Sequence, residues 1–282
     1  MIEKKIEVYA ESFAQHNLSN VELIVEVNND YLVLALSKID DKKIIAYEYF
    51  EFNAEGENWN TIFSEAKAQS KIFLSDYATC RLFYNVPEML VVPALYDDEE
   101  NAKTYLNTFY GNLKTNAVEI NKLQAFNNVS IVYSVDEQLK QIIDDSFKPA
   151  SVQHTCSKLL QKIYRTEQNE NRKNLHLFFY NKMFVVVLVK NTQLQFIKPV
   201  NYTLPNDMLY FILNVIKQYG VNIDDVQLKV AGFINIDSAE LAALQNYFAH
   251  VIIQKPTEAN SAEHFFNNFP EHYFTPFFYL QA

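Results

Sequence analysis

The chain has 282 residues, a formal net charge of −10 and a composition that is 49% hydrophobic and 21% charged, which is typical of a globular protein with a sizeable core. The negative charge argues against nucleic-acid binding, because the longest basic runs are pairs such as Lys42-Lys43. No apolar run approaches the roughly 20 residues that span a bilayer, the N-terminus lacks a secretory signal, and the distant Cys80 and Cys156 fit free thiols, so we expect a cytoplasmic protein.

The chain opens with a polar segment, residues 1–20, that we interpret as an arm. A meander of three strands follows, and its first turn is Asn28-Asn29-Asp30. In the first strand Leu23, Val25 and Val27 alternate with Glu22, Ile24 and Glu26, which predicts one clearly apolar face. The expected elements of this unit are strands at 22–27, 31–36 and 43–52, a helix at 59–71 and a strand at 80–85, with a short apolar run at 88–93 that enters a loop.

The middle of the chain carries clear helix boundaries. The acidic cluster Asp97-Asp98-Glu99-Glu100 suits a helix N-terminus, where carboxylates meet the positive end of the dipole, and Gly111 is expected to end that helix. Asp136 is expected to cap another helix, which stops before Pro149. The remaining expected elements are strands at 117–123, 129–134 and 151–155, a helix at 157–164 and a polar linker at 166–174.

The second half repeats the order of the first. Three strand-like runs between Leu175 and Tyr202 contain the turn Tyr180-Asn181-Lys182, and an amphipathic helix from Pro205 to Tyr219 follows, with Gly220 at its end. The remaining expected elements are a strand at 226–231 that leads to Gly232-Phe233, a helix at 238–249 and a strand at 251–254. The duplicated β-β-β-α-β order predicts an α/β fold.

Two such units joined near the middle of the chain resemble the actin-like ATPase superfamily, over roughly residues 21–255. Residues 129–163 resemble the passage between the two halves in its pilus-assembly and cell-division members. The whole chain also resembles an uncharacterised Bacteroidetes family, DUF3822, which is assigned an actin-like fold and no established activity. The resemblance implies a ribonuclease H-like fold with an N-terminal lobe at 1–165 and a C-terminal lobe at 166–282.

The resemblance also indicates where a nucleotide would bind. Working members hold phosphates with two hairpin turns that contain Asp and Gly, and adenosine with a Gly-rich turn. The matching turns here are Asn28-Asn29-Asp30, Tyr180-Asn181-Lys182 and Ala231-Gly232-Phe233, which keep one aspartate and one glycine between them. Asp30, Lys182 and Gly232 are therefore candidate vestigial cofactor-binding positions. Backbone N–H groups cradle a phosphate only where the chain can bend around it, which usually requires glycine. We therefore expect no catalytic residue and no cofactor, and binding of ATP with Mg²⁺ is the alternative.

Three other groups of residues offer alternatives. His154 and Cys156 resemble half a metal site, but the sequence shows no third or fourth ligand, so core or interface packing is the favoured interpretation. The aromatic tail at 264–280 either closes the core or forms a docking surface, since clustered Phe and Tyr are typical of interface hot spots. His264 and His272 frame that tail and are expected to pack within it.

Three functions follow from this pattern. The leading hypothesis is a non-catalytic, actin-like scaffold that binds a protein partner. The first alternative is a divergent nucleotide-binding ATPase or kinase of the same fold, and the second is a structural protein that associates with itself. Fold alone does not choose among them, because function lives in sites.

Overall fold

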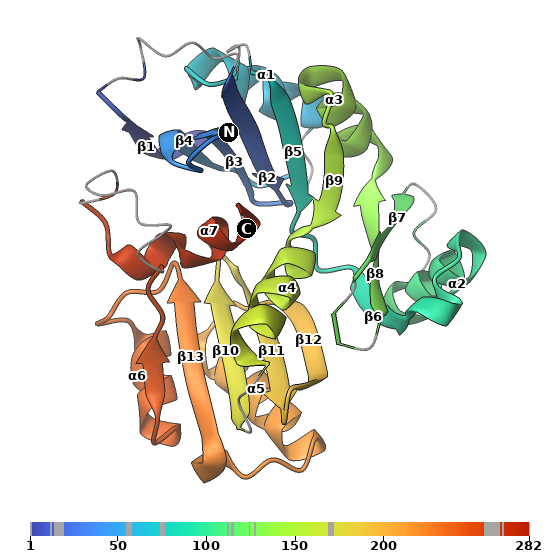
Figure 1. Ribbon diagram of the computed structural model, residues 1–282, viewed down its shortest axis with the longest axis vertical. Coiled ribbons are helices and arrows are strands. Elements are labelled where there is room, and N and C mark those ends of the chain that lie inside the picture. Colours follow the sequence, from blue (N-terminus) through green and yellow to red (C-terminus); the bar gives the residue numbers. More distant parts are fainter. Residues whose placement is uncertain are drawn as a thin grey trace.

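The computed structural model describes residues 2–11, 13, 20–54, 58–73, 77–111, 113, 116–123, 125–126, 128–168, 172–256, 266 and 268–281. Two sheets stand one above the other, and helix α4 (Thr155–Glu167) runs from the first toward the second (Figure 1). The predicted lobe boundary at residues 165 and 166 falls in the last turn of α4 and stays a prediction.

The upper sheet has six strands in the order β1-β4-β3-β2-β5-β9. Strand β1 pairs antiparallel with β4 at the edge of this sheet, so the interpretation of residues 1–20 as an arm was wrong for the part that forms β1. Its side chains alternate between exposed and half-buried, as suits an edge strand with little apolar surface. The strands are β1 (Glu3–Tyr9), β2 (Val21–Val27), β3 (Tyr31–Lys38), β4 (Ile44–Glu51), β5 (Thr79–Tyr84) and β9 (Ser151–His154), and helices α1 (Trp59–Gln69) and α3 (Glu137–Phe147) pack beside one another.

Strand β2 is buried on both faces, beyond the one apolar face that its alternation predicts. All seven of its residues are buried, including Glu22 and Glu26. The guanidinium of Arg81 pairs with Glu22 at 2.5 Å, and the hydroxyl of Thr155 donates to Glu26 at 2.7 Å. Arg81 on β5 and Thr155 on α4 therefore supply polar partners for the two buried carboxylates.

A small unit is inserted between β5 and α3. It has a three-stranded antiparallel sheet in the order β6-β8-β7, covered by one helix, with its own core of Val92, Ala102, Leu106 and Val132. The run at 88–93, expected to enter a loop, forms strand β6, because β8 supplies it with a hydrogen-bonding partner. The elements are β6 (Met89–Pro93), the 3-10 helix η3 (Ala94–Tyr96), α2 (Glu99–Tyr110), β7 (Asn116–Lys122) and β8 (Val129–Asp136).

The lower sheet repeats the first in its strand order, β12-β11-β10-β13-β14. Three antiparallel strands are followed by a helix and a strand that pairs parallel with the first of them, as β13 does with β10 and β5 does with β2. This duplication confirms the predicted α/β fold. The elements are β10 (Lys173–Phe179), β11 (Met183–Lys190), β12 (Gln193–Asn201), α5 (Pro205–Gln218), the 3-10 helix η4 (Ile223–Asp225), β13 (Val226–Gly232), α6 (Ala239–Tyr247) and β14 (Val251–Ile253).

The predicted helix ends are confirmed by their hydrogen bonds. Side-chain oxygens of Asp98, Asp136 and Ser238 accept from backbone N–H groups in the first turns of α2, α3 and α6. Gly111 and Gly220 lie at the ends of α2 and α5 with positive φ angles, which glycine adopts without steric cost.

The aromatic tail returns to the space between the two sheets (Figure 1). Its described part contains the 3-10 helix η6 (Glu271–Phe274) and α7 (Thr275–Leu280), and every residue of α7 is buried. Of the two alternatives for the tail, these residues adopt the core role; His264 lies outside the described residues. In the described part of the chain, no helix combines the length and apolarity needed to span a membrane.

Candidate functional site at the junction of the lobes

In the first predicted phosphate turn, backbone groups form hydrogen bonds with other groups of the same chain. The side-chain oxygen of Asn28 accepts hydrogen bonds from the N–H groups of Asp30 at 2.7 Å and Tyr31 at 2.8 Å. The carbonyl of Asp30 accepts from the N–H of Phe52 at 2.9 Å. Backbone N–H groups cradle a phosphate only where they point at it. Two N–H groups of this hairpin are therefore engaged by the chain itself.

The second predicted phosphate turn brings a ring into the junction. Tyr180 follows β10, its N–H donates to the carbonyl of Met183 at 2.8 Å, and its side chain is buried. The ring stacks on Tyr31 of the first lobe, with centroids 6.0 Å apart and planes at 3°. Asn85 donates from Nδ2 to the hydroxyl of Tyr31 at 2.7 Å. The two turns thus meet through stacked phenol rings.

The third predicted turn is held against β10 by a close backbone contact. Gly232 has a φ of 93°, and a Cβ placed there would lie 2.0 Å from the carbonyl oxygen of Phe179. The N–H of Phe233 donates to that same carbonyl at 2.9 Å, and the Phe233 ring meets the ring of Tyr49 edge to face at 5.1 Å. Only glycine fits this position, and the turn presents a bulky ring to the first lobe.

Rings from the tail occupy the space that remains. Tyr47 on β4 meets Phe274 and Phe277 edge to face, at centroid distances of 5.3 and 5.1 Å, and Tyr279 meets Phe178 on β10 at 5.9 Å. The junction keeps a cavity of about 20 Å³, the space of roughly one water molecule. Its lining consists of Glu26, Tyr31, Val33, Tyr47, Tyr49, Phe179, Tyr180, Phe233, Tyr273, Pro276 and Phe277.

A buried carboxyl group lies in the wall of this cavity. Burial raises the pKa of Glu26 to about 7, although hydrogen bonds from Thr155 and Tyr31 act in the opposite direction. Sequence reasoning did not single out Glu26, because the alternation in its strand identified only the apolar face. The signal was present, since a carboxylate in an otherwise apolar strand needs a partner when the strand lies in the centre of a sheet.

The three predicted cofactor positions do not share a pocket. Asp30 lines a groove on the far side of its turn, the side chain of Lys182 is exposed, and Gly232 lies beneath Phe179. None of the three is among the residues that line the cavity between the lobes. Their role in binding a cofactor stays a prediction.

The groove that contains Asp30 has a volume of about 450 Å³ and separates the inserted unit from the first lobe. Three carboxyl groups line it, those of Asp30, Glu88 and Asp136. Burial raises the pKa of Glu88. The apolar part of the lining is Ala54, Trp59, Val86, Leu113 and Leu139, and the polar remainder is Asn29, Asn53, Asn116 and Ser134.

A buried ionic cluster in the second lobe was also missed. Glu167, at the end of α4, contacts His176 at 2.8 Å and Lys229 at 2.6 Å. Burial raises the pKa of Glu167, but the hydrogen bond and charge of His176, with Lys229 and Asn174, outweigh it and lower the pKa to about 2. Lys229 lies far in sequence from Glu167, Asn174 and His176, and the pairing of β10 with β13 places it beside His176.

The candidate half metal site packs in the core. His154 is fully buried, its Nδ1 accepts from the N–H of Cys156 at 3.1 Å, and its Nε2 lies 2.9 Å from the carbonyl oxygen of Val86. His154 therefore caps α4, and burial lowers its pKa to about 4. Within the described ranges, no group of three or more His, Cys, Asp and Glu is arranged to hold a metal ion.

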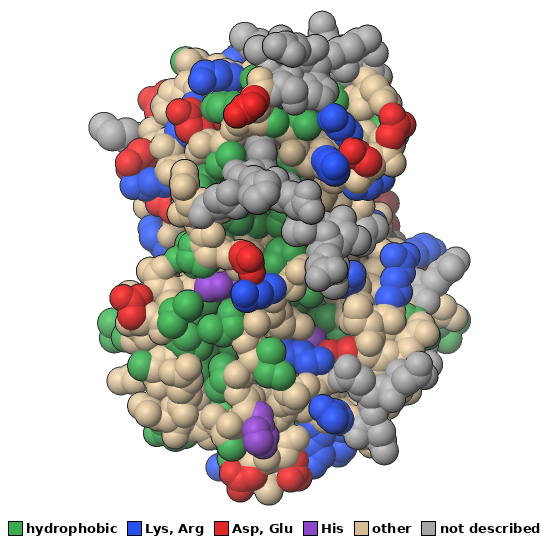
Figure 2. Space-filling view, turned by 60° about the vertical axis from the view of Figure 1, so that its left-hand side comes forward, with side chains coloured by type: hydrophobic (Ala, Val, Ile, Leu, Met, Phe, Trp, Pro, Cys, Tyr) green, Lys and Arg blue, Asp and Glu red, His purple; other side chains and the backbone are tan. Residues whose placement is uncertain are grey.

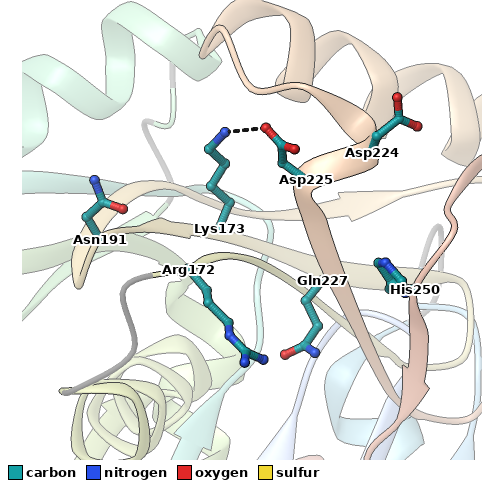
Figure 3. Close-up of a pocket in the computed structure, with 7 residues that line it drawn as sticks. All are labelled: Arg172, Lys173, Asn191, Asp224, Asp225, Gln227 and His250. Atoms are coloured by element: carbon teal, nitrogen blue, oxygen red, sulfur yellow. Dashed lines mark hydrogen bonds and ion pairs between the residues drawn. The ribbon is translucent and has the colours of Figure 1, made fainter.

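A further cavity of about 570 Å³ opens at the opposite end of the second lobe (Figure 3). Lys173 pairs there with Asp225 at 2.8 Å, while Arg172 and Gln227 extend to the other side of the sheet. Figure 2 shows the neighbouring side, where hydrophobic side chains gather around α6 and β14. Exposed hydrophobic residues of this region are Ile236, Tyr247 and Ile252.

Comparison with known families decides where the chain belongs. The family model described as protein of unknown function (DUF3822) matches residues 10–251. The chain belongs to the DUF3822 family. No curated protein matches this DUF3822 chain.

Solved structures show the fold of this DUF3822 protein. A protein of unknown function with an actin-like ATPase fold from Bacteroides thetaiotaomicron aligns with a TM-score of 0.74 and 14% identity, over 84% of this chain and 91% of that one. The PilM–PilN type IV pilus biogenesis complex aligns with a TM-score of 0.61 and 10% identity, over 92% of this chain and 97% of that one. The chain therefore has an actin-like ATPase fold, which confirms the predicted fold.

Proposed function

We propose that this DUF3822 protein is a non-catalytic scaffold that binds a segment of a protein partner. The filled junction between the lobes carries the proposal. Pockets for small molecules have volumes of roughly 300–1,000 Å³, whereas the cavity that remains at the junction of the lobes has a volume of about 20 Å³. The rings that fill this space come from both lobes and from the tail, so opening it would expose apolar surface to water.

The groove beside the inserted unit is the surface that we assign to the partner. Its floor offers Trp59 and Leu139, and its walls carry three carboxyl groups. This combination favours an extended segment with apolar side chains and at least one lysine or arginine, because opposite charges complement one another across an interface. The complex of PilM with PilN, a protein of this fold with a partner, supports the proposal. The buried free thiols of Cys80 and Cys156 support a cytoplasmic setting.

Calorimetric titration with ATP and Mg²⁺ tests whether the protein is a non-catalytic scaffold that binds no nucleotide. We expect a flat trace with ATP and with ADP. Heat that saturates at one site per chain would instead favour the nucleotide-binding alternative, and the Asp30→Ala and Lys182→Ala variants would then locate the site.

Site-specific photo-crosslinking in the source cells tests whether a protein partner binds in the groove beside the inserted unit. A photoreactive residue at Leu113, on the groove, is expected to form a discrete crosslinked product, whereas the same residue at Asp145, an exposed site on α3, is not. A Glu88→Lys change should remove the product by reversing one groove charge, while Asp145→Lys preserves it. Equal crosslinking at both positions would contradict the assignment of the groove.

A further inference from the structure

The small cavity between the lobes places an acidic oxygen in a closed space. Glu26 is 3% exposed and belongs to the lining of the 20 Å³ cavity. The groups that stabilise its charged form are the hydroxyls of Thr155 and Tyr31, both neutral. No lysine, arginine or histidine of the described chain contributes to its charge balance. A buried carboxylate without a countercharge must be neutralised by a proton or by a cation.

Two further oxygens in the lining are only weakly engaged. The hydroxyls of Tyr49 and Tyr180 are buried and make no hydrogen bond of regular geometry within the part of the chain that the structure describes, with Glu51 near Tyr49 and Asn85 near Tyr180. Tyr49 comes from β4 of the first lobe and Tyr180 from the hairpin of the second. Buried polar groups are almost always satisfied, and two hydroxyls without a hydrogen bond of regular geometry beside a cavity favour a bound water or ion.

The rest of the lining is aromatic. Rings of Tyr31, Tyr47, Phe233 and Phe277 surround the same space. The faces of aromatic rings carry partial negative charge and attract cations. A lining that combines one carboxylate, phenol oxygens and ring faces favours a positive occupant over a neutral one.

We propose that the cavity between the lobes is a binding site for one dehydrated monovalent cation of the size of potassium or ammonium. The space accepts a single water-sized species, so an organic ammonium ion is too large. One carboxylate balances one positive charge, and hard oxygen donors suit an alkali cation rather than a soft metal. The ion joins the two lobes by bridging oxygens from both.

The cation competes with a proton for Glu26. The titratable groups that face this carboxyl are phenols on β3, β4 and the second hairpin and the thiol of Cys156 on α4, and burial raises the pKa of each. His154, one residue before Thr155, stays neutral because burial lowers its pKa. Glu26 is therefore the group that changes charge here near neutral pH, and binding strengthens as the pH rises.

Thermal unfolding in different chloride salts at equal ionic strength tests the proposal. At about pH 8, potassium or ammonium chloride should raise the Tm by about 2–4 °C over choline chloride, whose cation cannot enter. The increase should saturate with salt concentration and should shrink at about pH 6. Equal Tm values in potassium, ammonium and choline salts would overturn the proposal and leave a water molecule as the occupant.

Two variants separate ion binding from general salt effects. Glu26→Gln keeps an acceptor for Thr155 but removes the charge, and Tyr180→Phe removes one oxygen while keeping the stacked ring. Both should lose the potassium effect, whereas Tyr9→Phe, at a hydroxyl outside the cavity, should keep it. Crystals grown with rubidium provide a direct readout: an anomalous peak beside Glu26 is expected, and its absence in crystals that diffract well contradicts the site. A potassium effect that persists in Glu26→Gln would also refute it.

Discussion

Single buried carboxyl groups control how this molecule responds to pH, and Glu26 is the clearest case. Burial raises its pKa in the folded state to about 7, above the ordinary value of 4.5. The folded chain therefore holds more protons than the unfolded chain between these values, and stability rises as the pH falls from about 7 toward 4.5. Above about pH 7, the full cost of a buried charge remains.

Glu26→Gln should accordingly stabilise the protein at high pH. In choline chloride near pH 8, we expect the free energy of unfolding to increase by about 2–3 kcal/mol, because the variant avoids ionising a buried group. Near pH 5 the difference should vanish. Urea unfolding at both pH values measures it, and a variant that is less stable at the higher pH would contradict this account.

The pKa of Glu167 is shifted in the opposite direction from that of Glu26. Its pKa is lowered to about 2, since the contacts with His176 and Lys229 outweigh burial. Its contribution is present above the ordinary pKa of 4.5 and is lost as the pH falls toward 2. Glu167→Gln should cost about 3 kcal/mol at neutral pH, because Lys229 loses its charged partner. Unfolding curves of the two proteins should converge near pH 2, whereas a constant gap would exclude the ionic explanation.

At the scale of elements, the junction depends on one backbone contact between β10 and the end of β13. Gly232→Ala places a methyl group 2.0 Å from the carbonyl oxygen of Phe179, at a φ that L-residues avoid. We expect a loss of about 3 kcal/mol or more. Gly220→Ala is the matched control, because Gly220 also has a positive φ but faces open space, so it should cost only about 1–2 kcal/mol. Chemical denaturation of both variants measures the contrast.

The elements that the sequence predicted best are those with strong local signals. The hairpins and α5 combine long apolar runs with clear turns, and Gly220 marks where α5 ends. Strand β1 was missed because it is an edge strand with charged side chains, and its partner β4 lies about 40 residues away. The alternation in β2 predicted one apolar face but not the burial of Glu22 and Glu26, because a local pattern does not reveal that Arg81 and Thr155 lie beside them.

The candidate site was harder to predict, for a physical reason. The turns that contain Asp30 and Lys182 were located correctly, but their chemistry depends on what lies opposite. Tyr31 and Tyr180 stack only because the two lobes meet, and no local pattern encodes that distance. The aromatic tail carried a signal in its composition, yet its destination between the sheets depends on the assembled fold.

At the scale of the whole molecule, the tail fastens the two lobes together. Arg81 of the first sheet donates to the carbonyl of Leu280 at 3.0 Å, and the side chain of Gln281 donates to Ser37 at 3.1 Å. On the second lobe, His272 Nε2 lies 2.7 Å from the carbonyl oxygen of Ile234. With rings packed against both sheets, the lobes are expected to move as one body.

Calorimetry should therefore record one unfolding transition for both lobes, with equal calorimetric and van't Hoff enthalpies. Phe274→Ala should lower the stability of the whole transition by about 3–5 kcal/mol, because this buried ring contacts both Tyr47 and Phe233. Phe109→Ala, at an exposed ring, should change it by less than about 0.5 kcal/mol. Two separate transitions, with only one sensitive to Phe274, would show that the lobes are independent.

The position of the tail has a consequence for synthesis on the ribosome. The contacts of Arg81 with Leu280 and of Ser37 with Gln281 span 199 and 244 residues, so the first sheet cannot complete its packing until after the second has been made. Until then Tyr47 and its neighbours present aromatic surface to the solvent. A chain interrupted before the tail would keep that surface exposed, and we expect chaperones and proteases to recognise such nascent or truncated chains.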